Sequence, residues 1–516
     1  MRLRPTYRQA DAARYRSPGG AWDVPTLDRL LSSPRRADGA AIVDGDVVLD
    51  AAGLDRVVTA LAGGLRSVGI RRGDVVCWQL PNWWEAVALF RACWRAGAVA
   101  APIHHQVGAA EAQRMLDALQ PVLTLASDGM PLADLVECCR VRGGDRNFDM
   151  LLSQGPQRGG IGRGADVAVV LFTTGSTGHP KPVLHTHRGL AYKALSMTRA
   201  HGLTSNDAAL MPSPLAHVSG LLNSVLVPGT AAMPVVLMEK WDPERGARLV
   251  GEHNVSFMIG PPTLFMGMMD VPGSRDWVHS LRVVSCGGMG VTPEFIDLAR
   301  QELGATVKRT YGSTEAPTVT TCTADDGPDK ARDTDGHSVG DAVIRVADPA
   351  SGRTVAAGKK GEVLLRGPEL FVGYGDETQT KEVIRRGWFA TGDLGTLDAD
   401  GWLTIVGRVK DMIIRSGENI ASAEVERLLE MHPGVRQAVV VGCPDERVGE
   451  RVAAFIVGDG ALDVEECQRW FTAQGVAKFK TPEMVVHLEA IPLLGIGKPD
   501  RPALRARLSA HGSAAR

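Results

Sequence analysis

The sequence predicts an α/β protein: a large N-terminal α/β body with parallel sheets and a smaller antiparallel, barrel-like part, followed by a small α+β C-terminal domain. Three observations predict it. Short apolar and β-branched runs alternate with helical patterns from residue 40 onward. Near Gly361 the pattern changes to short strands joined by Asp/Gly turns. The chain has 516 residues, room for about three compact units of roughly 150 residues each.

The first strand–helix–strand unit lies between residues 75 and 103. Residues 75–80 form a strand pattern, Asn82 and Glu85 have the spacing of a capping box, and residues 83–96 form a helix that ends at Gly97. Residues 98–103 form the next strand, so the two strands are expected to be parallel. The first 20 residues are expected to be a loose arm.

The later elements follow from the same patterns. The apolar run 167–172 is typical of a strand buried on both faces. Further strands are expected at 255–260, 281–288, 305–312, 361–367, 401–408 and 411–416, and the last unit is expected to contain helices 423–431 and 464–474 and strands 438–443, 451–458 and 484–489. We place the domain boundary between residues 407 and 408, giving domains 1–407 and 408–516.

Composition restricts the class of function. With 57 basic and 59 acidic side chains, the chain lacks the basic surplus that phosphate-backbone recognition needs, so no nucleic-acid partner is expected. The apolar stretches are far shorter than the roughly 20 residues of a membrane span, and the basic start lacks the apolar core of a signal peptide. A cytoplasmic location is therefore predicted. The eight cysteines have no disulfide or zinc spacing and are expected to be reduced and mostly buried.

The strongest motif is TTGSTGHPKP, from Thr173 to Pro182, directly after a predicted buried strand. Its glycines and hydroxyls let backbone N–H groups approach a phosphate closely, and Lys181 adds a point charge suited to a polyphosphate. The motif is not a Walker loop, since that loop needs GxxxxGK followed by Ser or Thr. A plain surface loop is the alternative for this segment taken alone.

Three further segments carry polar groups after strands. In YGSTEAP, Tyr311 offers a flat face for a base, Thr314 a hydroxyl and Glu315 a hard oxygen ligand for Mg²⁺. Asp393 follows a Thr-Gly turn and has the two acceptor oxygens that both ribose hydroxyls need. Lys498 lies in GIGKP, where neighbouring glycines leave space for it to project into a site. Each of these segments alone also fits an ordinary strand end or surface turn.

Taken together, the order and spacing of these segments resemble the adenylate-forming family of acyl-CoA synthetases, adenylation domains and luciferases. The resemblance extends from Asp23 to Leu508, and within the family it is greatest to bacterial cyclohexanecarboxylate-type or medium-chain acyl-CoA ligases. It implies a reaction in which ATP and a carboxylate give an acyl-adenylate and pyrophosphate. A thiol, usually that of coenzyme A, then takes the acyl group and AMP leaves. The implied cofactors and co-substrates are ATP, Mg²⁺ and coenzyme A.

The resemblance also implies residue roles. Lys498, Lys181 and His217 would be catalytic, and Mg²⁺ would be held by Glu315 and Thr177. The ATP- and AMP-binding set would be Thr173, Thr174, Gly175, Ser176, Thr177, Gly178, Lys181, Gly287, Gly288, Tyr311, Gly312, Ser313, Thr314, Asp393, Arg408 and Lys498.

For the thiol step, the family's small C-terminal domain rotates about a hinge, which corresponds to Lys410 here. The rotation presents the loop Ser416, Gly417, Glu418 and Asn419 to the thiol channel. His217 would lie beside the acyl group and this channel, at a position where amino-acid-activating relatives have an Asp. An amino-acid substrate is therefore not expected.

The acyl pocket implied by the resemblance consists of His217, Val218, Leu222, Thr263, Met266, Met289 and Pro317, with Gly287, Gly288 and Gly312 beside it. These positions are mostly small or apolar and carry no fixed positive charge for a second carboxylate. They predict a hydrophobic monocarboxylic acid. Pro182 departs from the family, which usually has Gly after the loop lysine, and it is expected to stiffen the loop.

Three alternatives remain from the sequence. In the first, the acyl acceptor is the phosphopantetheine of an acyl carrier protein instead of coenzyme A, for whose phosphates Lys478 and Lys480 are candidate contacts. In the second, Gly336 to Gly340 read GHSVG, which matches the GxSxG nucleophile elbow of serine esterases, although a strand pattern follows where that elbow needs a helix. The third alternative is a binding protein with a decayed site, but all five expected charged groups are present.

Overall fold

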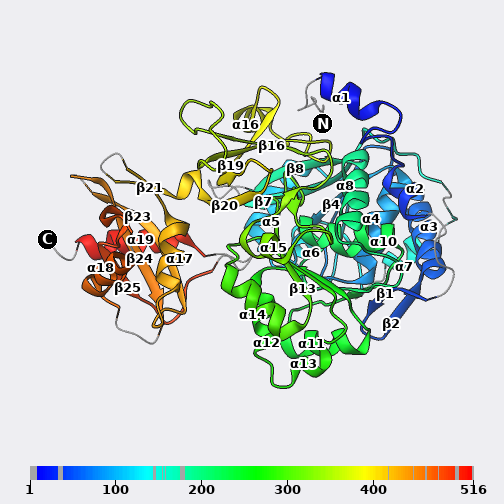
Figure 1. The fold of residues 1–516 in the computed structure, drawn as a ribbon. Helices are drawn as coiled ribbons and strands as arrows, with labels where there is room; N and C mark the ends of the chain where they lie inside the picture. The colour runs from blue at the N-terminus through cyan, green and yellow to red at the C-terminus, as the bar shows by residue number, and fades with distance from the viewer. Residues whose placement is uncertain are drawn as a thin grey trace. The chain divides into compact units, whose positions relative to one another are not determined.

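The chain divides by compactness into two units, which are described separately. The computed structural model describes residues 9–32, 39–142, 147–153, 155–156, 159–174, 180–415, 418–445, 447–458, 462–474, 476–493 and 499–513. Unit 1 comprises Met1–Ile344 and Leu365–Phe389, and unit 2 comprises Arg345–Leu364 and Ala390–Arg516 (Figure 1). The boundary at 407/408 concerns which segment rotates as a body, and it stays a prediction.

Unit 1 contains a six-stranded sheet in the order β6-β5-β3-β4-β7-β8. Its strands are β3 (Val75–Gln79), β4 (Val99–Ile103), β5 (Leu123–Ala126), β6 (Cys139–Arg140), β7 (Val167–Thr174) and β8 (Pro180–Thr186). β3 and β4 are parallel with Val75 opposite Val99, and α4 (Trp84–Ala96) connects them, which confirms the predicted strand–helix–strand unit. Gly97 ends α4 with a φ of 77°, as expected for a left-handed cap.

The second sheet of unit 1 has nine strands in the order β15-β14-β13-β12-β11-β9-β10-β1-β2. They are β1 (Ala40–Asp44), β2 (Val47–Asp50), β9 (Ala209–Met211), β10 (Val235–Leu237), β11 (Phe257–Gly260), β12 (Val283–Cys286), β13 (Thr306–Tyr311), β14 (Thr320–Thr321) and β15 (His337–Ser338). The strands from β1 through β10, β9, β11 and β12 to β13 are paired in parallel. This arrangement confirms the predicted parallel body.

Helices cover both faces of the two sheets. One apolar core joins both sheets to α3 (Ala51–Ser67), α4 and α8 (His187–Ala200), which therefore lie between them. A second core packs α11 (Pro243–Glu252), α12 (Pro262–Met269) and α14 (Pro293–Leu303) on the nine-stranded sheet. A third packs α5 (Ala109–Leu119) and α6 (Pro131–Leu135) on the six-stranded sheet. Unit 1 is thus a layered α/β structure (Figure 1).

Short helices complete unit 1. They are α1 (Gln9–Arg16), α2 (Leu27–Leu31), α7 (Asn147–Leu152), α9 (Val218–Gly220), the π-helix η1 (Leu221–Leu226), α10 (Val227–Ala231), α13 (Ser274–Trp277), α15 (Pro328–Asp333) and α16 (Glu377–Val383). The expected loose arm is therefore wrong for residues 9–16. The Tyr15 side chain is buried against Trp22, with ring centroids 4.9 Å apart, and this contact stabilises α1.

A five-stranded sheet follows the order β16-β17-β19-β18, with β20 paired to β19. Its strands are β16 (Val343–Ala347), β17 (Gly361–Arg366), β18 (Ile384–Arg385), β19 (Trp388–Leu397) and β20 (Leu403–Arg408). The pairs β18–β19 and β19–β20 are antiparallel, which confirms the predicted change of pattern near Gly361. The division between the two units passes through β16, β17 and β19.

The C-terminal part of unit 2 is the predicted α+β structure. Its sheet has the order β22-β21-β24-β23 with β25 beside β24; the strands are β21 (Met412–Arg415), β22 (Glu418–Ala421), β23 (Gln437–Asp445), β24 (Gly449–Val457) and β25 (Met484–His487). Alternate residues of β23 and β24 pack against α17 (Ser422–Glu430) and α18 (Val464–Ala473), and the intervening residues pack against α19 (Arg501–Ser513). The 3₁₀ helices η2 (Val409–Asp411) and η3 (Lys478–Lys480) complete it.

Two further expectations concern the whole chain. All eight cysteines are free; six are buried and Cys138 and Cys443 are partly buried, as predicted. Among the described residues, every helix is too short or too polar to cross a membrane.

Candidate functional site

The predicted acyl-pocket and base-binding residues follow four neighbouring strands of one sheet. β9, β11, β12 and β13 are adjacent and parallel, and their ends are in register, since Gly260 lies opposite Cys286 and Cys286 opposite Arg309. His217 follows β9, Met266 follows β11, Met289 follows β12, and the Tyr311–Pro317 segment follows β13. The carboxyl ends of neighbouring parallel strands form one edge, where α/β proteins bind their ligands.

Some of the side chains that follow these strands are apolar and partly exposed. Met266 and Met289 are 47% and 36% exposed, and Thr263 lies on the same face of α12 as Met266, one turn earlier. Val218, Leu222 and Pro317 are buried. Apolar side chains left exposed beside buried ones at a strand edge are typical of a binding surface for an apolar group.

Two glycines let the strand-end loops pack tightly. A Cβ on Gly287 would lie 2.5 Å from the carbonyl oxygen of Thr310, and a Cβ on Gly312 would lie 2.4 Å from the backbone nitrogen of Thr318. Both contacts are shorter than real Cβ atoms make. The loops after β12 and β13 can therefore keep this spacing only with glycine at these positions.

The loop after β13 is held by groups from distant parts of unit 1. Ser313 and Ala316 close it with reciprocal backbone hydrogen bonds of 3.0 and 3.2 Å. The His185 ring nitrogen Nε2 lies 2.7 Å from the carbonyl oxygen of Thr314, and burial lowers the pKa of His185 to about 4, so the neutral ring donates this bond. The backbone of Phe371 donates to the Glu315 carbonyl at 2.8 Å. This support fixes the backbone from which the Glu315 side chain projects.

The Glu315 carboxylate is bound by a residue that the motif analysis missed. The Tyr374 hydroxyl donates to Glu315 Oε1 at 2.8 Å, and the Lys181 ammonium lies 5.4 Å from the centroid of the Tyr374 ring. Burial and the neighbouring Glu315 charge raise the pKa of Tyr374, so its hydroxyl remains a donor at all physiological pH values. The available sequence signal was a lone Tyr between Gly373 and Gly375, which does not indicate a site by itself.

The two ends of the phosphate-loop motif lie on paired antiparallel strands. Thr173 lies opposite Lys181, and Thr174 opposite Pro180, so β7 and β8 include residues that the sequence assigned to a loop. That part of the prediction is wrong, because strand pairing continues to the motif's two ends. Gly175, Ser176, Thr177 and Gly178 lie outside the described residues.

A fully buried ion pair lies behind the loop after β13. Lys193 on α8 and Glu369 are both 0% exposed, and the Lys193 ammonium lies 3.0 Å from Glu369 Oε1. The same ammonium donates to the Thr318 carbonyl at 2.8 Å. Thr318 has a φ of 34°, a strained conformation for a β-branched residue. The pair therefore stabilises the strained end of this loop, and nothing in the sequence pattern indicated it.

Unit 2 brings two predicted nucleotide contacts together. Asp393 on β19 lies opposite Arg408 on β20, and Arg408 Nε is 2.9 Å from Asp393 Oδ1. Asp393 is buried, whereas the Arg408 side chain is half exposed. The charge-assisted pairing orients the carboxylate and leaves part of the guanidinium accessible.

The remaining unit 2 predictions concern the hinge and the C-terminal lysine. Lys410 is exposed in η2, directly after β20, and Asp411 beside it accepts a hydrogen bond from the Ser422 hydroxyl at its carbonyl oxygen. The backbone of Glu418 begins β22. Ser416, Gly417 and Lys498 lie outside the described residues, as do the side chains of Glu418 and Asn419.

His217 is an exposed residue on a well-anchored loop. Its Nδ1 accepts a hydrogen bond of 3.2 Å from the Ser219 backbone and so caps α9. The loop before it is held by Asn82, whose amide donates to the carbonyls of Pro212, Ser213 and Met238 and accepts from the Leu215 backbone. Asn82 was predicted as the N-cap of α4. That prediction is wrong: the cap is Trp83, and the Asn82 side chain is used by the loop instead.

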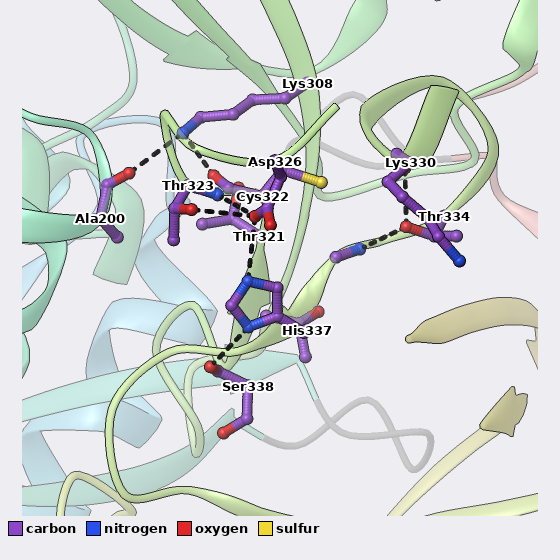
Figure 2. A network of polar contacts seen from close by, with 12 residues as sticks. Ala200, Lys308, Thr321, Cys322, Thr323, Asp326, Lys330, Thr334, His337 and Ser338 are labelled. Atoms are coloured by element: carbon purple, nitrogen blue, oxygen red, sulfur yellow. Dashed lines mark hydrogen bonds and ion pairs between the residues drawn. The ribbon is translucent and has the colours of Figure 1, made fainter. Parts of the chain in front are cut away.

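The GHSVG segment does not have the geometry of a nucleophile elbow. Its His337 and Ser338 form the short strand β15, and a second strand follows instead of a helix. The Ser338 hydroxyl donates to the Ala342 carbonyl. The His337 ring nitrogens lie 2.9 Å from Asp326 Oδ2 and 3.1 Å from the Ser338 carbonyl oxygen (Figure 2). The histidine therefore does not contact the hydroxyl that it would have to activate.

Figure 2 also shows a buried lysine next to this segment. Lys308 on β13 is 2% exposed and donates to the carbonyls of Ala200 and Cys322. Burial lowers the pKa of Lys308 to about 8. Its charge lies at the C-terminal end of α8, where a helix favours a cation, so Lys308 joins β13 to α8 and β14.

The residues present fit a magnesium ion held jointly by protein and phosphates. Glu315 offers a hard carboxylate oxygen, and the described residues contain no cluster of three or more His, Cys, Asp or Glu side chains that would form a protein-only metal site. Mg²⁺ in nucleotide sites usually has one or two carboxylate ligands and takes its other ligands from phosphates and water.

Comparisons with known proteins agree with this architecture. The family model described as AMP-binding enzyme matches residues 32–375, and the model described as AMP-binding enzyme C-terminal domain matches residues 424–498. A medium-chain fatty-acid–CoA ligase of Escherichia coli (strain K12) is 31% identical over 535 residues, covering 98% of this chain and 94% of the relative. A feruloyl-CoA synthase of Amycolatopsis sp is 34% identical over 499 residues, covering 93% and 96%. The crystal structure of ATP-bound MatB from Rhodopseudomonas palustris has a TM-score of 0.87 and 26% identity, covering 94% and 99%.

Proposed function

The chain belongs to the AMP-binding enzyme family as an AMP-forming acid–thiol ligase, and we propose that it activates a hydrophobic monocarboxylic acid and transfers the acyl group to coenzyme A. The observation that carries the proposal is the shared edge of β9, β11, β12 and β13, where an apolar surface lies beside the Tyr311–Glu315 loop. We also propose a cytoplasmic location.

The first half-reaction joins two anions. A carboxylate oxygen attacks the α-phosphorus of ATP, the bond to the β-phosphate oxygen breaks, and pyrophosphate leaves with that electron pair. Positive charge must balance the developing negative charge on the phosphorus oxygens. We assign this role to Lys498 between the carboxylate and the α-phosphate. The leaving pyrophosphate is assigned to the Thr173–Lys181 segment. Glu315 and Thr177 would hold Mg²⁺, which would supply further charge neutralisation.

The nucleoside contacts follow from the residue types and the resemblance. Tyr311 covers the adenine, with Gly287, Gly288, Gly312, Ser313 and Thr314 beside it. Asp393 accepts the ribose hydroxyls, and its ion pair with Arg408 supports this role because it holds the carboxylate in one orientation. Lys410 is assigned to the hinge, and residues 416–418 to the thiol channel.

The acid pocket is supported by the chemistry of the strand edge. Thr263, Met266 and Met289 supply exposed, uncharged surface, and Val218, Leu222 and Pro317 are buried beside the same strand ends. A long or cyclic apolar acyl group fits such a surface better than an ammonium or a second carboxylate. The two relatives are named for medium-chain fatty acids and a feruloyl group, which supports an apolar acid.

Coenzyme A is the acceptor favoured by the relatives' names. Of the two lysines that are candidates for binding its phosphates, Lys480 is paired with Glu424 at 2.5 Å, whereas Lys478 is exposed. Lys478 is therefore the better candidate for this contact. An acyl carrier protein presents the same phosphopantetheine thiol and remains the alternative acceptor.

The test is pyrophosphate release with ATP and Mg²⁺ across acids of increasing chain length, aromatic and alicyclic acids, an amino acid and a dicarboxylic acid, with and without coenzyme A. Mass detection identifies the product. We expect release with apolar monocarboxylic acids and an acyl-CoA product. Lys359→Ala, a change at an exposed lysine of unit 2, should behave as wild type. Pyrophosphate release without thioester formation would indicate that a carrier protein is the acceptor. Pyrophosphate release only with amino or dicarboxylic acids would refute the proposed substrate class.

A further inference from the structure

Tyr374 connects the two polar segments that the proposed function assigns to the phosphates. Its hydroxyl donates to Glu315 Oε1 at 2.8 Å, and its ring lies 5.4 Å from the Lys181 ammonium. Glu315 follows β13 of the nine-stranded sheet, and Lys181 lies on β8 of the six-stranded sheet. One side chain therefore contacts both the predicted metal ligand and the predicted phosphate-binding cation.

We propose that Tyr374 is a positioning residue for the Mg²⁺–phosphate contact. The Tyr374 hydroxyl binds Oε1 of the Glu315 carboxylate and leaves Oε2 as the oxygen available to the ion. The Tyr374 ring orients the Lys181 ammonium. This inference rests on the proposed function, because it concerns the same nucleotide site.

The backbone of the Tyr374 segment is fixed from two sides. Val372 donates to the Leu184 carbonyl at 2.8 Å and Leu184 donates to the Gly373 carbonyl at 3.0 Å, so this segment pairs with β8. The neighbouring Phe371 backbone donates to the Glu315 carbonyl at 2.8 Å. The hydroxyl thus has a defined position relative to both strands before any ligand binds.

The chemistry of the phenol suits this role. A carboxylate that accepts a hydrogen bond on one oxygen is oriented and loses one of its acceptor directions, which favours single-oxygen contact with a small ion that requires octahedral geometry. An ammonium within about 6 Å of a ring centroid is attracted by the negative face of the ring. The ring has no charge of its own, so this contact orients the ammonium without neutralising it.

The experiment measures ATP binding by calorimetry, without any acid, at a series of Mg²⁺ concentrations. Tyr374→Phe keeps the ring and removes the hydroxyl. We expect the Mg²⁺ concentration for half-maximal enhancement of ATP binding to rise about tenfold, as the loss of one hydrogen bond to a charged group implies. ATP affinity without Mg²⁺ should be unchanged. Tyr374→Leu also removes the ring and should weaken ATP binding without Mg²⁺ as well.

The matched control is Tyr192→Phe. Tyr192 is a buried tyrosine of the same unit whose hydroxyl accepts a hydrogen bond of 2.6 Å from the Asp341 backbone and does not contact Glu315. Its Mg²⁺ dependence should equal that of wild type. In a Glu315→Gln background, Tyr374→Phe should change the Mg²⁺ dependence no further, which separates positioning from general loss of structure.

An unchanged Mg²⁺ dependence in folded Tyr374→Phe would overturn the inference and leave the proposed activity intact. An equal effect of Tyr374→Phe in the wild-type and Glu315→Gln backgrounds would also overturn it, since the hydroxyl would then act on another group. Failure of the wild-type enzyme to release pyrophosphate with any acid would instead refute the proposed function.

Discussion

Lys193→Met should be one of the most destabilising single substitutions in unit 1. Both members of the Lys193–Glu369 pair are 0% exposed, and neither Glu369 oxygen makes another hydrogen bond within the described part of the chain. Removing the lysine leaves a buried carboxylate without compensation, which costs about 3–5 kcal/mol. It also removes the donor to the Thr318 carbonyl at the strained end of the Glu315 loop.

The double substitution Lys193→Met with Glu369→Gln separates charge from packing. It removes both charges at nearly constant volume, so the remaining cost is the lost bond to Thr318 and imperfect pairing of the new amide, about 1–2 kcal/mol. The double variant should therefore be about 2–3 kcal/mol more stable than Lys193→Met alone. A matched control is Lys381→Met, because its ion pair with Glu377 on α16 is exposed and should contribute no more than about 1 kcal/mol.

The assay is hydrogen exchange of the α8 amides, since a chain of two units does not give one global unfolding free energy. Exchange in Lys193→Met should accelerate by about 10²- to 10⁴-fold, and the double variant should recover most of the protection. The reasoning would be refuted by a double variant that exchanges as fast as the single one, because buried charge would then not be the cause. An acceleration below about fivefold in the single variant would refute it as well.

Three further predictions test other parts of the site. Lys498→Ala should abolish adenylate formation, measured as acid-dependent pyrophosphate release, while thioester formation from supplied acyl-adenylate continues; equal loss of both would refute the assigned role. Asn82→Ala should leave the Pro212, Ser213 and Met238 carbonyls without their donor and raise the KM for the acid more than that for ATP, which steady-state kinetics can measure. His201 is buried with neither ring nitrogen hydrogen-bonded in the described chain, and burial holds its pKa well below 6.5. Because the unfolded state binds the proton more readily, stability is present above pH 6.5 and is lost as pH falls, by up to about 1.4 kcal/mol per pH unit per such histidine. His201→Phe should reduce this slope in the hydrogen-exchange protection of the α8 amides between pH 6.5 and 4.5, and an unchanged slope would contradict the assignment.

Three of the four strands at the site edge were predictable because their positions follow from local pattern. Apolar runs ended by glycine mark buried parallel strands, so β11, β12 and β13 could be located and their following residues nominated together. The supporting residues could not be found this way. His185 reaches Thr314 across 129 positions, Lys193 reaches Thr318 across 125, and Tyr374 reaches Glu315 across 59. No period of 2 or 3.6 residues connects such pairs, and only sheet topology brings them together.

The antiparallel pair of β7 and β8 shows why local signals failed at the phosphate motif. The segment that contains Pro180 and Pro182 was predicted to be a loop because its Thr, Ser and Gly residues are typical of turns. Proline also lacks the N–H that a strand donates. In an extended strand the N–H and C=O of one residue face the same side, and the Pro182 carbonyl accepts from Gly375, on the side away from β7. Pro180 is two residues away and faces the same side. The missing N–H groups therefore cost β8 nothing in its pairing with β7. They reduce only its pairing with the Tyr374 segment, which supplies side-chain contacts to Lys181 and Glu315 instead.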